Sequence, residues 1–160
     1  MTTDNRQTPT VTDFMTSTVH TVSPDTEITE AVGTLISKGC SGAPVVDAEG
    51  HVVGVLTHEG CMRALSGAAF NREPAGRVSD HMSREFVIAE PTSDLFHAVS
   101  VLSNDGGRRV LIVADHKLQG IVTRTDALKA LDKFRKEREQ AGDGVNIETV
   151  AVGWSALTQQ

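Results

Sequence analysis

The chain has 160 residues, of which 39% are hydrophobic and 22% are charged, and its formal net charge at pH 7 is −6. This size and composition fit one globular domain or two small packed repeats, and they exclude fibrous proteins and disulfide scaffolds. The acidic balance, the single Trp and the absence of Tyr argue against a nucleic-acid binder and against a protein that binds anionic membranes.

The first half of the chain predicts an extended segment, a helix, a β-hairpin and a second helix. In the first helix the apolar residues recur at i, i+3, i+4, i+7 and i+8, from Ile28 to Ile36, which gives one apolar stripe. Gly39 follows where a helix C-terminus favours a left-handed residue. In chain order these elements are the extended segment Val19–Val22, the helix that starts at Ile28, the strands Ala43–Val46 and Val52–Leu56, and the helix after Thr57.

The second half of the chain repeats this order. Asp13-Phe14-Met15 recurs as Asp80-His81-Met82 at an offset of 67 residues, and Gly54 recurs as Gly120 at an offset of 66. A register held over a whole unit indicates internal repetition. The equivalent elements are the extended segment Phe86–Ala89, the helix that starts at Leu95 and ends near Gly106, the strands Val110–Val113 and Leu118–Val122, and the helix after Thr123.

Three local patterns carry a resemblance to a known family. They are the two Asp-x-Met sequences, the strand Ser41–Asp47 (SGAPVVD) and the segment Gly120–Asp126 (GIVTRTD). In a repeated β-α-β-β-α unit they resemble a tandem pair of cystathionine β-synthase (CBS) domains, or Bateman module, over residues 9–133. The resemblance implies an α+β (α/β-like) fold of two repeats packed with pseudo-twofold symmetry. We expect repeat one at 9–66, a linker at 67–77, repeat two at 78–133, and a helical extension and tail at 134–160.

The resemblance also implies a function. Such modules bind adenosine-containing ligands (AMP, ADP, ATP, S-adenosylmethionine and, in some members, NAD or cyclic di-AMP) in clefts between the repeats. We therefore expect a non-catalytic regulatory module that senses such a ligand, forms a homodimer and acts on a separate effector protein. Two alternatives stay open, namely a ligand-independent dimerisation scaffold and an enzyme that handles nucleotides.

The start of the last predicted helix has chemistry that suits a ribose phosphate. An aspartate in a first helical turn can accept both ribose hydroxyls, a threonine hydroxyl and helix N–H groups suit oxygen-rich ligands, and an arginine binds phosphate. Asp126, Thr123 and Arg109 fill these roles. By resemblance to the family, the further ligand contacts are Thr18, His20 and Ser41 at the adenine, Ile121 on its face, Arg108 beside Arg109 at the phosphate, and Arg124.

These residues also have purely structural interpretations. Thr123 and Asp126 have the spacing of a helix cap, in which Thr123 binds a backbone N–H and Asp126 faces the positive end of the helix. The arginines at 108, 109 and 124 can be solvated charges. Repeat one has Gly60 in place of the ribose aspartate, with Glu59 beside it, so we expect its cleft to bind weakly or not at all.

No pattern nominates a catalytic residue or a metal site. The six histidines show no metal-ligand spacing with one another or with Cys40 and Cys61, and no nucleophile elbow is present. We expect the cysteines to be buried small hydrophobic residues, and we expect no required cofactor. The lack of a signal-peptide pattern and of long apolar runs favours a cytoplasmic protein without a membrane partner.

Beyond the repeats, the last helix is expected to continue through the charged run Lys133–Glu139 and to end near Gly142. For its charges, a solvated face is favoured over a face that binds a partner. The weakly alternating segment Val145–Gln160 predicts either an edge strand or a segment that lies across a dimer.

Overall fold

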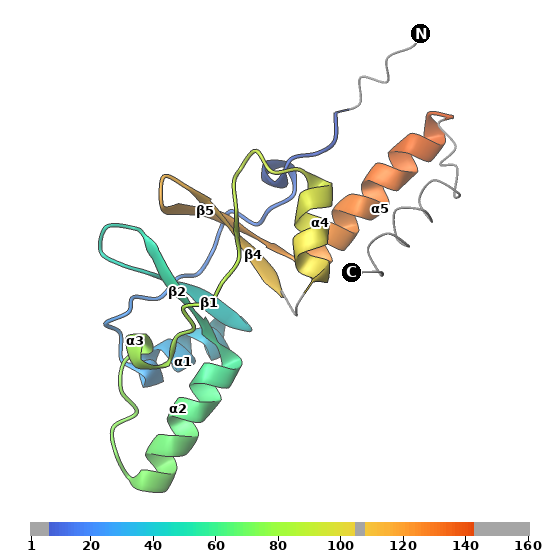
Figure 1. Ribbon diagram of the computed structural model, residues 1–160. Coiled ribbons are helices and arrows are strands. Elements are labelled where there is room, and N and C mark those ends of the chain that lie inside the picture. The colour runs from blue at the N-terminus through green and yellow to red at the C-terminus, as the bar shows by residue number, and fades with distance from the viewer. Residues whose placement is uncertain (1–6, 105–107, 143–160) are drawn as a thin grey trace.

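The structure is a computed structural model that describes residues 7–104 and 108–142. Its helices and strands follow the predicted order and form two similar halves, shown in Figure 1. In chain order the elements are η1 (Val11–Asp13), α1 (Ile28–Lys38), β1 (Gly42–Val46), β2 (Val52–Thr57), α2 (His58–Asn71), α3 (Val78–His81), β3 (Ile88–Ala89), α4 (Leu95–Ser103), β4 (Arg109–Ala114), β5 (Lys117–Thr123) and α5 (Arg124–Gln140).

Repeat one is a β-hairpin with two helices packed on it. β1 and β2 pair antiparallel, with Pro44 opposite Val55. Val22 lies beside β1 in the parallel direction, so the extended segment predicted at 19–22 contributes one bridge. The core is built from the inward faces of these elements, including Ile28, Ala31 and Leu35 of α1, Val45 and Leu56 of the sheet, and Cys61 and Ala64 of α2.

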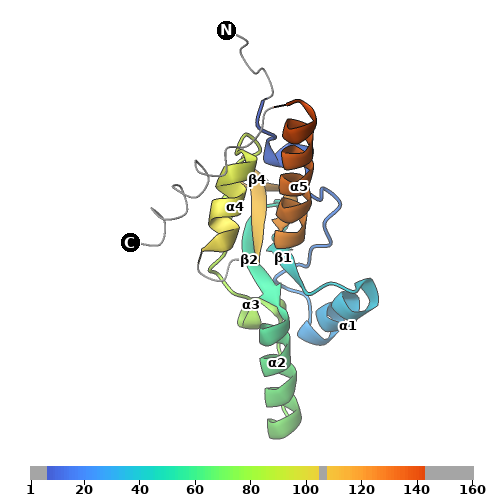
Figure 2. The ribbon, with the colours of Figure 1, turned by 90° about the vertical axis from the view of Figure 1, so that its right-hand side faces the viewer.

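Repeat two has the same plan. Its sheet has the order β3-β4-β5, with β3 parallel and β5 antiparallel to β4. The helices α4 and α5 lie side by side against this sheet, as Figures 1 and 2 show from two directions. The core combines Ala98 and Leu102 of α4, Val110 and Ile112 of β4, Val122 of β5 and Ala127 of α5. The molecule therefore has the α+β class and the paired repeats that the sequence predicts.

The segment in front of each repeat crosses to the other repeat. Thr16 pairs with β5 at Ile121, and Ser83 pairs with β2. The short helices cross in the same way, because η1 places Val11 in the core of repeat two and α3 places Val78 in the core of repeat one. The internal repetition did not reveal this exchange, which ties the two repeats together.

The aspartate of each Asp-x-Met sequence caps the short helix in which it lies. The Oδ2 atom of Asp13 accepts a hydrogen bond from the Thr10 backbone N–H at 2.9 Å. The Oδ2 atom of Asp80 accepts the equivalent bond from the Arg77 backbone N–H, also at 2.9 Å. A carboxylate so placed satisfies an N–H group that would otherwise lack a helical partner.

The methionine of each Asp-x-Met sequence packs on a glycine of the other repeat. A Cβ atom at Gly54 would lie 2.7 Å from Met82 Sδ, and one at Gly120 would lie 2.6 Å from Met15 Sδ. Real Cβ atoms do not approach other atoms so closely, so both strands need glycine here. The Asp-x-Met sequence and the strand glycine therefore recur together because they form one contact, made twice.

Three boundaries can be compared with the predictions. Gly39 ends α1 in the left-handed conformation, with φ of 63°. The helix α2 continues to Asn71, five residues into the stretch 67–77 that was predicted as linker, because its alanines favour helix, and Arg72 then ends it at φ of 56°. The helix α5 ends at Gln140, as predicted. Gly106 and the segment 145–160 lie outside the described residues.

The cysteines differ in exposure. Cys61 is buried in the core of repeat one, where burial raises the pKa of its thiol, whereas Cys40 is half-buried. The buried packing predicted for Cys61 is confirmed. Among residues 7–104 and 108–142, no helix combines the length and the apolar character that a membrane crossing requires.

Candidate functional site

A cleft of about 820 Å³ lies between the two repeats. Repeat one contributes the end of β2 and the first turn of α2, and repeat two contributes the segment before β3 and the start of β4. Its walls mix charged, hydroxyl and apolar side chains. The lining residues are Ser41, Val55, Thr57, His58, Glu59, Ser83, Arg84, Glu85, Phe86, Val87, Arg108, Arg109 and Leu111.

The helix α2 begins at this cleft. Thr57 is its N-cap, and the Thr57 Oγ1 atom accepts a hydrogen bond from the Gly60 backbone N–H at 3.1 Å. In the first turn, His58 places its Nε2 atom 2.8 Å from the Cys40 carbonyl oxygen, which holds the imidazole against the end of α1. The N-terminal end of a helix carries partial positive charge, so this wall favours anionic groups.

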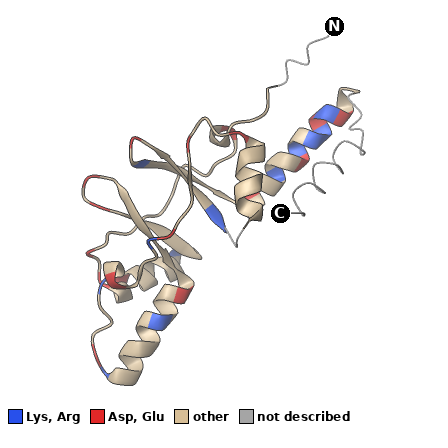
Figure 3. Ribbon diagram, viewed as in Figure 1, with Lys and Arg blue, Asp and Glu red and all other residues tan. Residues whose placement is uncertain are grey.

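Two arginines form the basic wall of the cleft, at the start of β4, where Figure 3 shows a basic segment. Arg108 is exposed, whereas Arg109 is half-buried and donates a hydrogen bond from Nη2 to Ser41 Oγ at 2.8 Å. Burial lowers the pKa of Arg109, and the charge of Arg108 lowers it further. Both effects oppose the charged guanidinium, so an anion bound beside these arginines would stabilise it.

The packing around Gly60 disfavours the aspartate that the family pattern has at this position. A Cβ atom at Gly60 would lie 2.7 Å from the backbone carbonyl oxygen of His81 in α3. An aspartate at this position would therefore require α3 to move. The carboxylates that do line the cleft are those of Glu59 and Glu85.

The equivalent junction of repeat two, between β5 and α5, is closed by a capping box. The Asp126 Oδ2 atom accepts hydrogen bonds from the Thr123 backbone N–H and from Thr123 Oγ1, both at 2.8 Å. The Asp126 backbone N–H donates to Thr123 Oγ1 at 3.3 Å. Arg124, next in the chain, donates from Nε to the Leu102 carbonyl oxygen at 3.2 Å, at the end of α4. The arrangement matches the structural interpretation of these residues.

The predicted ligand contacts fall into two groups. Ser41, Arg108 and Arg109 line the cleft. The other six do not line it, and they belong to the β5–α5 junction and to the segment that crosses to it: Thr18, His20, Ile121, Thr123, Arg124 and Asp126. Thr18 and His20 are exposed. Arg109 lies opposite Thr123 in the pairing of β4 with β5, so it stands between this cleft and the junction that holds Asp126.

The cleft residues missed by the prediction had a signal in the sequence. The repeat offsets of 67 and 66 carry the predicted contacts onto the lining of the cleft. The pairs are Thr18 with Glu85, His20 with Val87, Ser41 with Arg108, Ile121 with Val55, Thr123 with Thr57, and Arg124 with His58. The prediction centred on the β5–α5 junction because the Asp126 carboxylate can accept ribose hydroxyls, and the described cleft lies at the equivalent β2–α2 junction.

A protein-family model named CBS domain matches the chain twice, at residues 11–67 and 78–133. The chain belongs to the CBS domain family. Among curated proteins, this CBS pair is 35% identical over 135 residues to the CBS domain-containing protein YhcV of Bacillus subtilis, and the match covers 84% of the chain and 91% of that relative. It is also 30% identical over 121 residues to an uncharacterised protein of Methanocaldococcus jannaschii, covering 76% of the chain and 42% of the relative.

Solved structures agree with this assignment. The CBS pair matches the crystal structure of CBSX2 in complex with AMP at 29% identity and a TM-score of 0.69, covering 79% of this chain and 98% of that one. CBSX2 comes from Arabidopsis thaliana. Some longer relatives are named as enzymes, and the chain spans only 24% of the inosine-5'-monophosphate dehydrogenase of M. jannaschii. A match of this length thus covers most of one relative, YhcV, and a small part of another.

Proposed function

We propose that this CBS pair is a non-catalytic regulatory module that binds an adenosine-containing nucleotide in the cleft between its repeats. AMP, ADP, ATP and S-adenosylmethionine are the candidate ligands. The observation that carries the proposal is the cleft itself, in which the first turn of α2 faces Arg108 and Arg109. This is the cleft of repeat one, where Gly60 replaces the ribose aspartate and weak binding was expected, and the two arginines are the reason to propose the ligand here. The AMP complex of CBSX2, at 29% identity, supports an adenine nucleotide.

The chemistry of the cleft suggests how the ligand lies. We place the phosphate of the ligand at Arg108 and Arg109, where an anion offsets the mutual repulsion of the guanidinium groups. The base is placed against the apolar side chains of Val55, Phe86 and Leu111. Phosphate binding then competes with Ser41 for Arg109, so occupancy changes a contact between the residue before β1 and the start of β4. A separate effector protein is proposed to read this change.

A thermal-shift panel on the full chain tests this function. A ligand that binds only the folded state raises its stability by about 2.7 kcal/mol at a hundredfold excess over the dissociation constant. An adenosine compound should therefore raise the melting temperature more than its guanosine or pyrimidine counterpart. Equal shifts from ATP and GTP would exclude adenine selectivity, and release of phosphate from ATP would indicate an enzyme.

Asp126 is proposed as a ribose contact at the equivalent junction of repeat two. Its Oδ2 atom is used by the cap, and among the described residues no hydrogen bond to Oδ1 is present. If this junction binds ribose, Asp126→Ala should reduce the free energy of ligand binding by about 1.5–3 kcal/mol, which lowers the affinity roughly ten- to a hundredfold. If Asp126 only caps α5, the substitution should cost about 0.3–1 kcal/mol of folding stability and leave binding unchanged. Calorimetry with AMP, paired with urea unfolding, separates the two roles.

The alternative function is a ligand-independent dimerisation scaffold. It is favoured by the large apolar side chains that the helices expose, among which Ile36 is 76% and Phe70 is 89% exposed. No thermal shift with any adenosine compound, together with a stable dimer, would favour the scaffold.

A further inference from the structure

The hairpin between β1 and β2 gathers three side chains that can bind a metal ion. One ligand atom each from Asp47, Glu49 and His51 lies within 4.8 Å of the others. His51 Nδ1 is 4.0 Å from Asp47 Oδ2 and 4.0 Å from Glu49 Oε2. Nothing in the nucleotide-binding proposal uses these residues, which do not line the cleft.

The backbone of the hairpin orients the Asp47 carboxylate. Its Oδ1 atom accepts hydrogen bonds from the backbone N–H groups of Glu49 at 3.0 Å and His51 at 2.9 Å. These bonds occupy one oxygen and turn the other, Oδ2, toward the His51 imidazole. Metal sites commonly fix their ligands by such secondary hydrogen bonds.

A second imidazole comes from repeat two. His116 lies in the turn between β4 and β5, and its ring centroid is 5.6 Å from that of His51. The two hairpins are joined by a backbone bridge between His51 and Lys117 and by a hydrogen bond of 3.4 Å from the Val52 N–H to the His116 carbonyl oxygen. His116 therefore brings a second imidazole, from repeat two, next to the group formed by Asp47, Glu49 and His51, although its own ligand atoms do not lie within 4.8 Å of all three.

We propose that Asp47, Glu49 and His51, together with His116, bind a divalent transition metal ion of the Zn²⁺ type. Imidazole nitrogen with carboxylate oxygen is a donor set that suits Zn²⁺, whereas Mg²⁺ and Ca²⁺ prefer oxygen alone. The expectation of no metal site rested on spacing among histidines and cysteines, which leaves an Asp-x-Glu-x-His pattern uncounted. A bound ion would clip the hairpin of repeat one to the hairpin of repeat two.

Cobalt is the probe for this site, because Co²⁺ bound by nitrogen and oxygen donors absorbs visible light. The full chain, without an affinity tag, is titrated with Co²⁺, and Zn²⁺ and Mg²⁺ are then added as competitors. The variants are His51→Gln and His116→Gln, and the matched control is His97→Gln, an exposed histidine of α4. Melting temperature with and without Zn²⁺ is the second readout, and circular dichroism checks folding.

The proposal expects a saturable Co²⁺ signal that Zn²⁺ displaces and Mg²⁺ does not. His51→Gln should lose the signal, His116→Gln should bind roughly tenfold more weakly, and His97→Gln should match the natural chain. Zn²⁺ should raise the melting temperature of the natural chain and not that of His51→Gln. A lack of saturable binding, or an unchanged signal in folded His51→Gln, would overturn the proposal. An unchanged Co²⁺ affinity in His116→Gln alone would show that His116 is not a ligand. It would thus overturn the claim that the ion links the two hairpins.

Discussion

Gly54 and Gly120 are positions where one added methyl group would meet both a methionine sulfur and a backbone carbonyl oxygen. At Gly54 the nearest atoms are Met82 Sδ at 2.7 Å and the Ser83 backbone carbonyl oxygen at 2.8 Å from the position of a Cβ atom. The methionine can rotate away, but the carbonyl belongs to the segment that pairs with β2. An alanine at this position would therefore disturb the backbone pairing by which this segment crosses to repeat one.

Gly54→Ala should lower the free energy of unfolding by about 1–3 kcal/mol, because overpacking forces a backbone shift. Gly67→Ala is the matched control, since no atom lies within 4 Å of a Cβ atom at Gly67 in α2. There alanine should stabilise the chain by about 0.5–1 kcal/mol, because it favours helix. Urea unfolding of both variants measures these changes, and a Gly54→Ala variant as stable as the natural chain would contradict the packing described.

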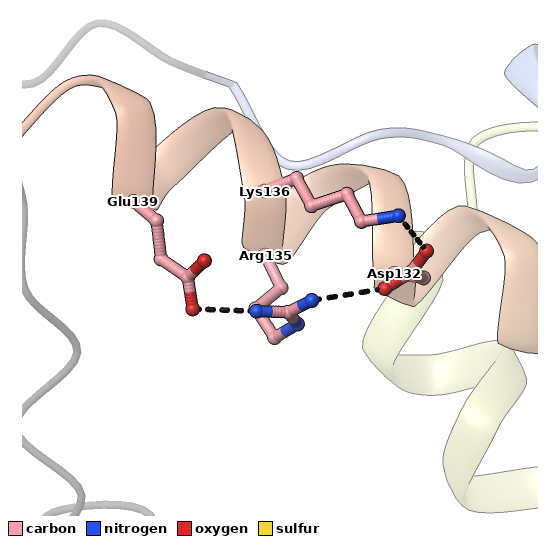
Figure 4. Close-up of polar contacts among 4 residues, drawn as sticks. All are labelled: Asp132, Arg135, Lys136 and Glu139. Atoms are coloured by element: carbon pink, nitrogen blue, oxygen red, sulfur yellow. Dashed lines mark hydrogen bonds and ion pairs between the residues drawn. The ribbon is translucent and has the colours of Figure 1, made fainter.

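At the scale of single elements, the helix α5 carries its own charge network. Asp132 bonds Lys136 at 2.7 Å and Arg135 at 3.1 Å, and Arg135 also bonds Glu139, as Figure 4 shows. All are spaced three or four residues apart on one helix, where opposite charges stabilise it. Figure 3 shows the alternation of basic and acidic residues along α5. These charged side chains pair with one another along the helix, which is consistent with the solvated face predicted for it.

The pKa of Asp132 is lowered, first by its hydrogen bond to Lys136 and then by Arg135. A lowered folded-state pKa stabilises the chain above the unfolded pKa, and this contribution disappears as pH falls through the folded-state value. Asp132→Asn should therefore cause a small loss of stability at neutral pH that vanishes in acid and shrinks in high salt. Urea unfolding at neutral and acidic pH checks this, and a loss that persists in acid would contradict it.

The elements themselves were readable from the sequence, because each has a local cause. The apolar stripe of α1, the left-handed Gly39 and the cap at Thr57 are set by neighbours within a few residues. The crossing of Thr16 to β5 is set by partners about a hundred residues away, and no local pattern carries it. The sequence shows that Asp-x-Met recurs. Only the structure shows that each methionine packs on Gly54 or Gly120 of the other repeat.

Prediction of the site was limited in the same way. The sequence pointed to Arg108, Arg109 and Ser41, which do line the cleft. It assigned them to the ligand of Asp126, because a pseudo-twofold pair offers two equivalent clefts and residue types alone do not place β4 between them. The Arg109–Ser41 hydrogen bond, which crosses between repeats, connects Arg109 to this cleft, whereas its pairing with Thr123 connects it to the junction of Asp126.

For the whole molecule, the exposed apolar side chains predict a homodimer. Among the described residues, most of them lie on four helices: Ile36 on α1 at 76% exposure, Met62 and Phe70 on α2 at 60% and 89%, Phe96 on α4 at 51%, and Leu128 on α5 at 67%. Val87 and Ile88, at β3, are also exposed. Burial of such a side chain stabilises an interface by about 1.5–3 kcal/mol, so a second copy of the chain is the natural cover.

Light scattering should give twice the mass of the chain at micromolar concentration. Ile36→Asp should shift the protein toward the monomer without unfolding it, because the side chain is exposed within one copy. A monomer at this concentration for the natural chain would sink the prediction.

The central claim is that a nucleotide phosphate binds at Arg109 in the cleft between the repeats. Calorimetry of AMP and adenosine with the natural chain and with Arg109→Ala tests it most directly. Loss of charged hydrogen bonds should reduce the free energy of AMP binding by about 1.5–3 kcal/mol, or lower the affinity roughly ten- to a hundredfold. Adenosine, which has no phosphate, should bind both proteins equally. Equal AMP affinity in the two folded proteins would contradict the account.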